Sequence, residues 1–169
     1  MTFVTGGARS GKSRLALRLA ERSGRPVAMI ATGEARDAEM AERIAKHRAE
    51  RPAGWRTIEE PTDLAAALGQ VAEGEFAIVD CLSLWVSNLI ESTPPEAIEA
   101  RAAGAAAVAA GHAGGCVAVS NEVGMGIVPM HPLARSYRDV LGRVNALWAE
   151  AAADAFLAVA GRVVPLERL

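Results

Sequence analysis

Short apolar runs without alternating polar residues recur along the chain, and longer segments with helical spacing separate them. The apolar runs predict strands at Thr2–Thr5, Val27–Ala31, Phe76–Asp80, Cys116–Ser120 and Phe156–Ala160. The segments between them predict helices at Lys12–Ser23, Ala38–Glu50, Thr62–Val71, Glu96–Ala110 and Leu133–Ala153. Uniformly apolar strands that alternate with helices are typical of a parallel sheet covered on both faces. The pattern therefore predicts an α/β fold with a mainly parallel sheet, to which Gly161–Pro165 can return as a short antiparallel edge strand.

The last long segment has the clearest helical pattern. Its apolar residues recur at intervals of three and four, at Tyr137, Val140, Leu141, Val144, Leu147, Trp148 and Ala151. The apolar face that results is wide enough to pack on the sheet or against another subunit.

The composition narrows the class of protein. With 169 residues the chain is expected to form one domain, residues 1–169. Hydrophobic residues make up 51% but aromatic ones only 4%, so the core is expected to consist mostly of Ala, Val, Leu and Ile. The formal net charge of −2 argues against a general nucleic-acid-binding protein, which would be basic. Cys81 and Cys116 lie in apolar surroundings and are predicted to be buried thiols.

Neither a targeting segment nor a membrane span is predicted. No charged segment followed by an apolar one opens the chain, so a signal peptide is not expected. The longest weakly polar stretch, Ala102–Ala110, is too short and too rich in alanine to cross a bilayer. These features predict a soluble cytoplasmic protein.

The segment GGARSGKS, Gly6–Ser13, follows the first predicted strand and fits the phosphate-binding pattern G-x-x-x-x-G-K-[ST]. Its glycines let successive backbone N–H groups surround phosphate oxygens, and the positive end of the next helix adds to the attraction. Lys12 would neutralise the β- and γ-phosphates, and the Ser13 hydroxyl would hold Mg²⁺. A purely structural glycine-rich turn is the alternative. Because a strand precedes the motif and a helix follows it, we interpret it as the nucleoside-triphosphate site of a P-loop NTPase fold.

Besides the Ser13 hydroxyl, such a site needs a second ligand for the metal, an acidic residue at the end of another buried strand. Asp80 closes the run FAIVD and is the best candidate. Alternatively, Asp80 caps a helix that starts near Leu82. Given the phosphate loop, we favour the metal role, which leaves the reaction and the acceptor open.

One histidine lies near the end of the second predicted helix. Asp37 can cap that helix, and Met40 and Ile44 mark its buried side. His47 comes three residues after Ile44, and two arginines follow it, at positions 48 and 51. An ordinary packed or solvated histidine is one interpretation. A second is a phosphorus nucleophile, because imidazole is neutral and nucleophilic near neutral pH.

Three stretches resemble one family closely: VTGGARSGKSRLA, DAEMAERIAKHRAERPAGWRT and NEVGMGIVPMHPLARSYRDVLGRVN. It is the bifunctional adenosylcobinamide kinase / adenosylcobinamide-phosphate guanylyltransferase family of cobalamin biosynthesis. The resemblance covers nearly the whole chain, with the blocks in the family's order. GGARSGKS and SNEVGMGIVP are more specific than a generic phosphate loop.

The resemblance implies two reactions. The aminopropanol hydroxyl of adenosylcobinamide takes the γ-phosphoryl of ATP or GTP, and a histidine then attacks the α-phosphorus of GTP and passes GMP to adenosylcobinamide phosphate. The product is adenosylcobinamide-GDP. The implied partners are these substrates with Mg²⁺, without a bound redox cofactor, nucleic acid or membrane, and the family is often trimeric, so a homotrimer is expected.

The family's functional residues carry over to matching positions of this chain. The guanylylated histidine falls on His47; many members have two consecutive histidines, and Lys46 replaces the first here. The implied nucleotide contacts are Gly6, Gly7, Ala8, Arg9, Ser10, Gly11, Lys12, Ser13, Ala31, Thr32, Gly33, Arg48, Ala49, Glu50, Arg51, Glu59 and Asp80. Glu59 would accept hydrogen bonds from ribose or guanine, or it is an ordinary solvated carboxylate. Some relatives have Glu in place of Asp80, and either can ligate the metal.

The segment Ser120–Pro129 follows the fourth predicted strand. Glu122 would act as a base for the acceptor hydroxyl or hold a water, or the segment supports the phosphate loop structurally. Two rival functions fit part of the chain. A single-activity small-molecule kinase would use the same loop without a histidine intermediate, and a GTP-binding switch protein would usually carry an Asn-Lys-x-Asp motif, which the sequence lacks.

Overall fold

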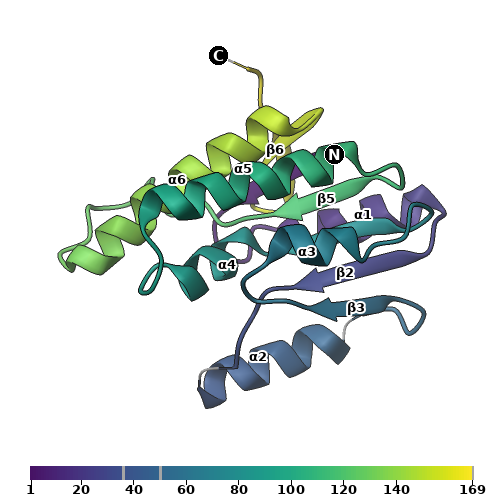
Figure 1. Ribbon diagram of the computed structural model, residues 1–169, viewed down its shortest axis with the longest axis horizontal. Coiled ribbons are helices and arrows are strands. Elements are labelled where there is room, and N and C mark those ends of the chain that lie inside the picture. The colour runs from purple at the N-terminus through teal and green to yellow at the C-terminus, as the bar shows by residue number, and fades with distance from the viewer. Residues whose placement is uncertain (36, 50, 169) are drawn as a thin grey trace.

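The computed structural model describes residues 1–35, 37–49 and 51–168, without the side chains of residues 43 and 47. Within these residues the strands form one seven-stranded sheet in the order β3-β2-β4-β5-β1-β6-β7 (Figure 1). Strands β1 to β6 pair in parallel, and β7 returns antiparallel to β6, so the predicted sheet and edge strand are confirmed. The strands are β1 (Thr2–Gly6), β2 (Val27–Ala31), β3 (Arg56–Glu59), β4 (Phe76–Asp80), β5 (Cys116–Val119), β6 (Asp154–Val159) and β7 (Arg162–Pro165).

Helices cover both faces of the sheet, as predicted, but unequally. They are α1 (Lys12–Ser23), α2 (Ala38–Ala49), α3 (Leu64–Gly69), α4 (Leu82–Leu89), α5 (Pro95–Gly111) and α6 (Pro132–Ala151). Helices α3 to α6 pack on one face and α1 on the other, whereas α2 lies beyond the β3 edge (Figure 1).

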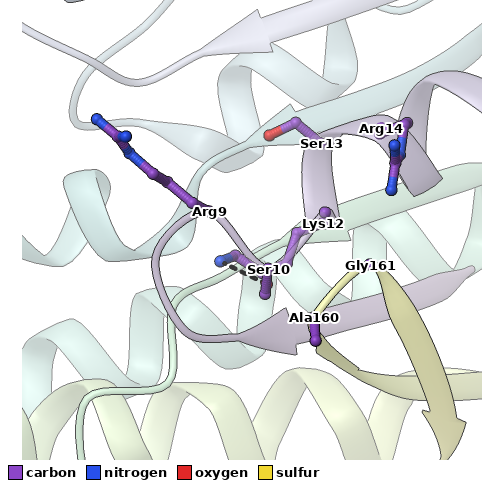
Figure 2. A pocket seen from close by; sticks show the side chains of 8 residues that line it. Arg9, Ser10, Lys12, Ser13, Arg14, Ala160 and Gly161 are labelled. Atoms are coloured by element: carbon purple, nitrogen blue, oxygen red, sulfur yellow. Dashed lines mark hydrogen bonds between the residues drawn. The ribbon is translucent and has the colours of Figure 1, made fainter.

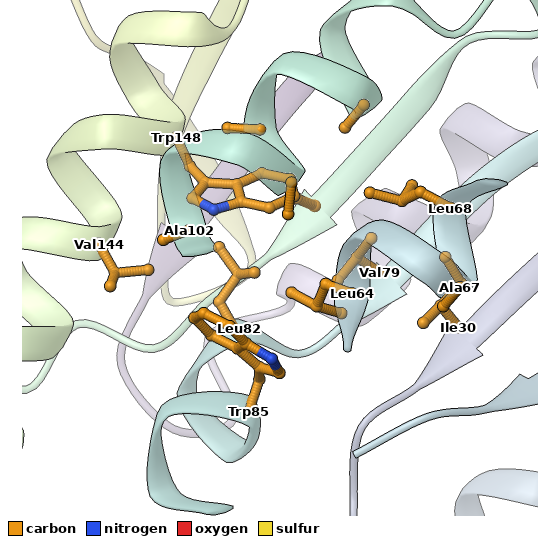
Figure 3. Packing of buried hydrophobic residues seen from close by; sticks show 14 of the residues in the cluster. Ile30, Leu64, Ala67, Leu68, Val79, Leu82, Trp85, Ala102, Val144 and Trp148 are labelled. Carbon is orange, nitrogen blue, oxygen red and sulfur yellow. The ribbon is translucent and has the colours of Figure 1, made fainter. Parts of the chain in front are cut away.

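The core is divided between these two faces because successive residues of a strand point to opposite sides. On β2, Ile30 joins the larger cluster under α3 to α6, whereas Met29 packs in the smaller cluster under α1. Figure 3 shows the larger cluster, in which Trp85 of α4 and Trp148 of α6 lie among aliphatic side chains. Both indoles are 1% exposed or less, so this cluster encloses them completely.

Strand β3 was not predicted from the sequence, and helix α4 was expected only in the alternative in which Asp80 caps a helix that starts near Leu82. Strand β3 buries only Ile58, and its other residues are exposed, so it gives no apolar run. Helix α4 is buried on most sides, and a short, uniformly apolar segment cannot be assigned to helix or strand by its periodicity. Tertiary packing, rather than the local sequence pattern, therefore determines the secondary structure of both segments.

The predicted apolar face of the last helix is confirmed, and it is buried within this chain. The residues Val140, Leu141, Val144 and Trp148 are each 1% exposed or less. They belong to the cluster that α6 shares with α4, α5 and β1. Of the two partners considered for this face, the chain's own helices and sheet occupy it.

Strand β1 lies inside the sheet, with β5 on one side and β6 on the other. The approach of β6 is close at the end of β1. Gly6 has φ 145°, and a Cβ atom there would lie 2.2 Å from the carbonyl oxygen of Ala158. Glycine is therefore required at this position by both backbone conformation and space.

Cys81 and Cys116 are free and buried, as predicted. Burial raises the pKa of the Cys81 thiol to about 11 and that of Cys116 to about 12, so both are neutral near pH 7. None of the helices in the described ranges is both long enough and apolar enough to cross a membrane.

Candidate active site

The ends of neighbouring strands form one row at the carboxyl edge of the sheet. The register pairs Ala31 of β2 with Glu59 of β3 on one side and with Asp80 of β4 on the other. The phosphate loop, residues 6–13 (hereafter the P-loop), leaves β1 at this same edge. Ligands of parallel α/β sheets bind beyond this edge. Residues predicted to contact the nucleotide thus lie along one edge of the sheet, although they are distant in the sequence.

Lys12 lies inside the turn of the P-loop, at the start of α1. Its side chain is buried, and Nζ donates hydrogen bonds to the carbonyl oxygens of Gly6 at 2.8 Å and Gly7 at 2.6 Å. Burial lowers the pKa of Lys12, and the nearby charge of Asp80 acts in the opposite direction. The loop therefore holds a cation on its inner side, where the predicted phosphates would need one.

A cavity of about 540 Å³ lies at the P-loop (Figure 2). Residues 9–14 line it together with Ala160 and Gly161 of the β6–β7 turn; we name it the P-loop cavity. The turn is held there by a hydrogen bond from Gly161 N to Ser10 O, 2.9 Å long. Sequence reasoning did not include Arg14 or the turn, because their position depends on the pairing of β6 with β1.

A smaller cavity of about 150 Å³, the Asp80 cavity, is lined in part by Ser13, Asp80 and Arg51. The predicted metal ligands Ser13 and Asp80 are thus brought together. A hydroxyl and a carboxylate are hard oxygen donors of the kind that Mg²⁺ takes beside nucleotide phosphates, so these residues fit the predicted ion. The alternative role of Asp80 is not favoured, because Cys81 occupies the N-cap position of α4.

A third cavity of about 610 Å³ is lined by residues from β2, α2 and β3; we name it the Glu59 cavity. The predicted contacts in its lining are Ala31, Gly33, Arg48 and Glu59. Arg48 donates a hydrogen bond to Glu59, and the two side chains are 53% and 60% exposed. Exposed ion pairs contribute little to stability, so this pair can rearrange around a ligand at small cost.

Arg51 links the Asp80 cavity to strand β3. Its Nη1 donates to Thr57 Oγ1 of β3 at 3.1 Å, while the residue also lines the Asp80 cavity. Burial lowers the pKa of Arg51, and the carboxylate of Asp80 opposes this shift. The guanidinium therefore stays charged at the edge that is predicted to hold a triphosphate.

Thr32 has its side chain in the interior. Its hydroxyl donates to Cys81 O at 2.7 Å and accepts a hydrogen bond from Cys81 N at 2.9 Å. Asn88 of α4 holds the same segment, because its Nδ2 donates to Thr32 O at 2.7 Å and to Pro61 O at 3.0 Å. The Thr32 side chain thus joins the ends of β2 and β4. Its backbone N also donates to Asp80 O at 3.2 Å, so this fully buried residue has its side chain and both backbone groups bonded within the fold.

Helix α2 carries the predicted nucleophile. Asp37 caps it as predicted, since Oδ1 accepts a hydrogen bond from Met40 N at 2.7 Å. Ile44 is half-buried, and a Cβ atom on Gly33 would lie 3.4 Å from its Cδ1. His47 lies in the last turn, next to Arg48, and its side chain is outside the described part of the structure. The predicted contact Glu50 lies outside the described residues, and α2 ends at Ala49.

The segment 120–129 lies against the P-loop. Glu122 N donates to Gly6 O at 3.0 Å, and its carboxylate accepts a hydrogen bond from Gly124 N at 2.5 Å. Asn121 Nδ2 donates to Ser83 Oγ at 2.8 Å. These contacts favour the supporting role among the alternatives for this segment.

Comparisons with known proteins identify the family. Residues 2–166 match the family model described as cobinamide kinase / cobinamide phosphate guanyltransferase. The chain is 46% identical over 166 residues to the bifunctional adenosylcobalamin biosynthesis protein CobP of Pseudomonas aeruginosa, with 98% of this chain and 96% of that protein covered. It is 41% identical to the protein CobU of Escherichia coli and 39% identical to CobU of Salmonella typhimurium, both described in the same words as CobP, with 95% of this chain and 96% of each protein covered. The family resemblance and its two activities are confirmed, and the chain belongs to the cobinamide kinase / cobinamide phosphate guanyltransferase family.

Proposed function

We propose that this chain phosphorylates the aminopropanol hydroxyl of adenosylcobinamide and then converts the product to adenosylcobinamide-GDP. One observation carries the proposal: the P-loop, Asp80 and the Glu59 cavity lie along a single edge of the sheet, and α2 brings His47 to that edge. The family supplies the substrates, and the arrangement of side chains supports their assignment to particular residues.

In the first reaction the hydroxyl oxygen of the acceptor attacks the γ-phosphorus of ATP or GTP, the bond to the β-phosphate oxygen breaks, and the nucleoside diphosphate leaves. Lys12 stabilises the charge that develops on the phosphates. Ser13 and Asp80 would hold Mg²⁺, which when bound neutralises phosphate charge. Arg51, which lines the same cavity as Asp80, adds a second cationic side chain.

In the second reaction a ring nitrogen of His47 attacks the α-phosphorus of GTP, and pyrophosphate leaves. A phosphate oxygen of adenosylcobinamide phosphate then attacks the same phosphorus, and the bond to His47 breaks. Imidazole suits this sequence because it is nucleophilic when neutral and a good leaving group when protonated. The buried thiol of Cys81 is a poor alternative, since its pKa is about 11.

The Glu59 cavity suits the guanine base of the second reaction. The carboxylate of Glu59 can accept hydrogen bonds from the N–H groups on the edge of guanine, which adenine does not present in the same pattern. Arg48 pairs with Glu59 and lies next to His47 in α2, so it can contact the phosphates as the base engages Glu59.

The proposal includes a homotrimer in the cytoplasm, where ATP and GTP are available. The apolar face of α6 does not supply the contact between subunits, because it is buried within the chain. Apolar side chains of the segment 123–130 are candidates instead: Met125 is 80% exposed, Ile127 98% and Met130 96%. The mass of the assembly in solution tests this part.

The covalent intermediate gives the decisive test. We expect the protein to take up label from GTP carrying radioactive α-phosphorus but not from GTP labelled only at the γ position, and the bond should be labile in acid and stable in base. His47→Ala should lose this label and GMP transfer while keeping kinase turnover, and His131→Ala should behave as the wild type. Label on His47→Ala would assign the nucleophile to another residue. A wild type that never takes up label, yet phosphorylates the acceptor, would establish the single-activity kinase.

A further inference from the structure

The P-loop cavity extends beyond the loop itself. Its lining continues from Lys12 past Arg14, in the first turn of α1, to Ala160 and Gly161 in the β6–β7 turn. Its volume of about 540 Å³ is in the range of cavities that hold a whole small ligand rather than a phosphate alone. In the strand order, β6 and β7 lie on the opposite side of β1 from β2 and β3. The P-loop cavity and the Glu59 cavity therefore lie on opposite sides of one phosphate loop.

The guanidinium of Arg14 lies beside the β6–β7 turn. A Cβ atom on Gly161 would lie 3.0 Å from Arg14 Nη2, and one on Gly11 would lie 3.7 Å from it. Gly161 also has φ 75°, a conformation that favours glycine. Because glycine has no side chain, only backbone atoms form the wall of the P-loop cavity at this position. Figure 2 shows the Arg14 side chain next to Gly161, whereas Arg9 points away to the other side of the loop.

Arg14 has no partner of its own among the residues that the structure describes, since it makes neither a hydrogen bond nor an ion pair with them. A planar, weakly hydrated cation next to bare backbone offers a flat surface on which an aromatic ring can stack. The lining of the cavity holds no carboxylate or amide side chain. Apart from Arg14, its polar side chains all belong to the P-loop, where the phosphates bind. A base beside the β6–β7 turn would therefore be held by stacking, without a carboxylate or amide to distinguish adenine from guanine.

We propose that Arg14 and the Ala160–Gly161 turn form the subsite for the purine base of the nucleotide that donates its γ-phosphoryl group. This inference rests on the proposed function. The two reactions then share the P-loop for their phosphates but place the bases on opposite sides of it. The base of the phosphoryl donor lies beside Arg14 and is accepted as adenine or guanine, whereas the guanine of the guanylyl donor lies in the Glu59 cavity.

Calorimetric binding of ATP and of inorganic tripolyphosphate, each with Mg²⁺, tests the subsite directly. Arg14→Ala should bind ATP about tenfold more weakly, the size expected for loss of a guanidinium–ring contact, while tripolyphosphate affinity stays within about twofold. Arg14→Lys keeps the charge without the planar group and should recover only part of the loss. Arg18→Ala removes an exposed cation one turn further along α1 and should bind both ligands as the wild type does.

The other outcomes overturn the proposal. An equal loss for ATP and tripolyphosphate in Arg14→Ala would make Arg14 a phosphate contact, and unchanged ATP affinity would place the base elsewhere. Uptake of α-label from GTP by Arg14→Ala should stay within about twofold of the wild type, and its loss would assign Arg14 to guanylyl transfer. The comparison of ATP with tripolyphosphate requires neither an acceptor nor His47. Its result is therefore independent of whether the two proposed reactions take place.

Discussion

Replacing Thr32 by valine should lower the free energy of unfolding, because the buried backbone of Cys81 then loses hydrogen bonds. The hydroxyl of Thr32 bonds both backbone groups of Cys81, and the residue is fully buried. Valine fills nearly the same space but offers no hydrogen bond. Cys81 O keeps a second partner, because Trp85 N donates to it at 3.2 Å, whereas Cys81 N loses its bond. One lost bond costs about 1 kcal/mol and one buried orphan N–H about 1–2 kcal/mol, so we expect a loss of about 2–3 kcal/mol.

Urea unfolding followed by tryptophan fluorescence measures this loss, because Trp85 and Trp148 are buried and report on the larger core cluster. A loss of this size lowers the midpoint by roughly 1 M urea. Thr32→Ser is the matched control: it keeps the hydroxyl and removes one buried methyl group, which costs about 1 kcal/mol. If Thr32→Val proves as stable as Thr32→Ser, the two hydrogen bonds of the Thr32 hydroxyl do not stabilise the fold.

Three further predictions concern charged side chains. Lys12→Ala should weaken nucleotide affinity and lose several kcal/mol of transition-state stabilisation, measured as kcat/KM for phosphoryl transfer; unchanged values would refute the phosphate-loop assignment. Asp80→Asn should raise the Mg²⁺ concentration needed for half-maximal activity, because a neutral amide is a weaker ligand, and an unshifted Mg²⁺ curve in a folded variant would contradict this. The hydrogen bond from Arg56 lowers the pKa of Glu75 from 4.5 to about 2, so its contribution to stability is complete above pH 4.5 and is lost as the pH falls towards 2. Acid titrations of unfolding should therefore show a steeper fall for the wild type than for Glu75→Gln between these pH values, and parallel curves would contradict the role of this pair.

Helices and strands whose ends are marked by local sequence signals could be predicted with their exact first and last residues. The helix Lys12–Ser23 begins at the end of a glycine-rich loop and stops at Gly24, and the strands Val27–Ala31 and Phe76–Asp80 are compact apolar runs. In each of these segments local signals and tertiary packing favour the same structure. Strand β3 has no such signal, because hydrogen bonds to β2 rather than burial define it.

In the candidate site, too, some residues could be predicted from local sequence signals and others depend on the tertiary structure. The motif alone identified Lys12 and Ser13, and the end of a buried strand identified Asp80. The ion pair of Arg48 with Glu59 depends on the edge strand β3 and on the placement of α2, which no local pattern contains. The contact of the β6–β7 turn with the P-loop depends on strand order, since β6 pairs with β1 from the far end of the sequence.

The position of β1 between β5 and β6 has a consequence for how the protein is made. Synthesis produces the P-loop strand first, but its two neighbours come only from residues 116–119 and 154–159. Until then Phe3 and Val4, which are buried in the finished sheet, have no strand beside them, and both edges of β1 can pair with other chains. A nascent chain that already contains the complete phosphate-binding motif thus lacks the contacts that fix its shape, so the first part of the site to be translated is among the last to become able to bind nucleotide.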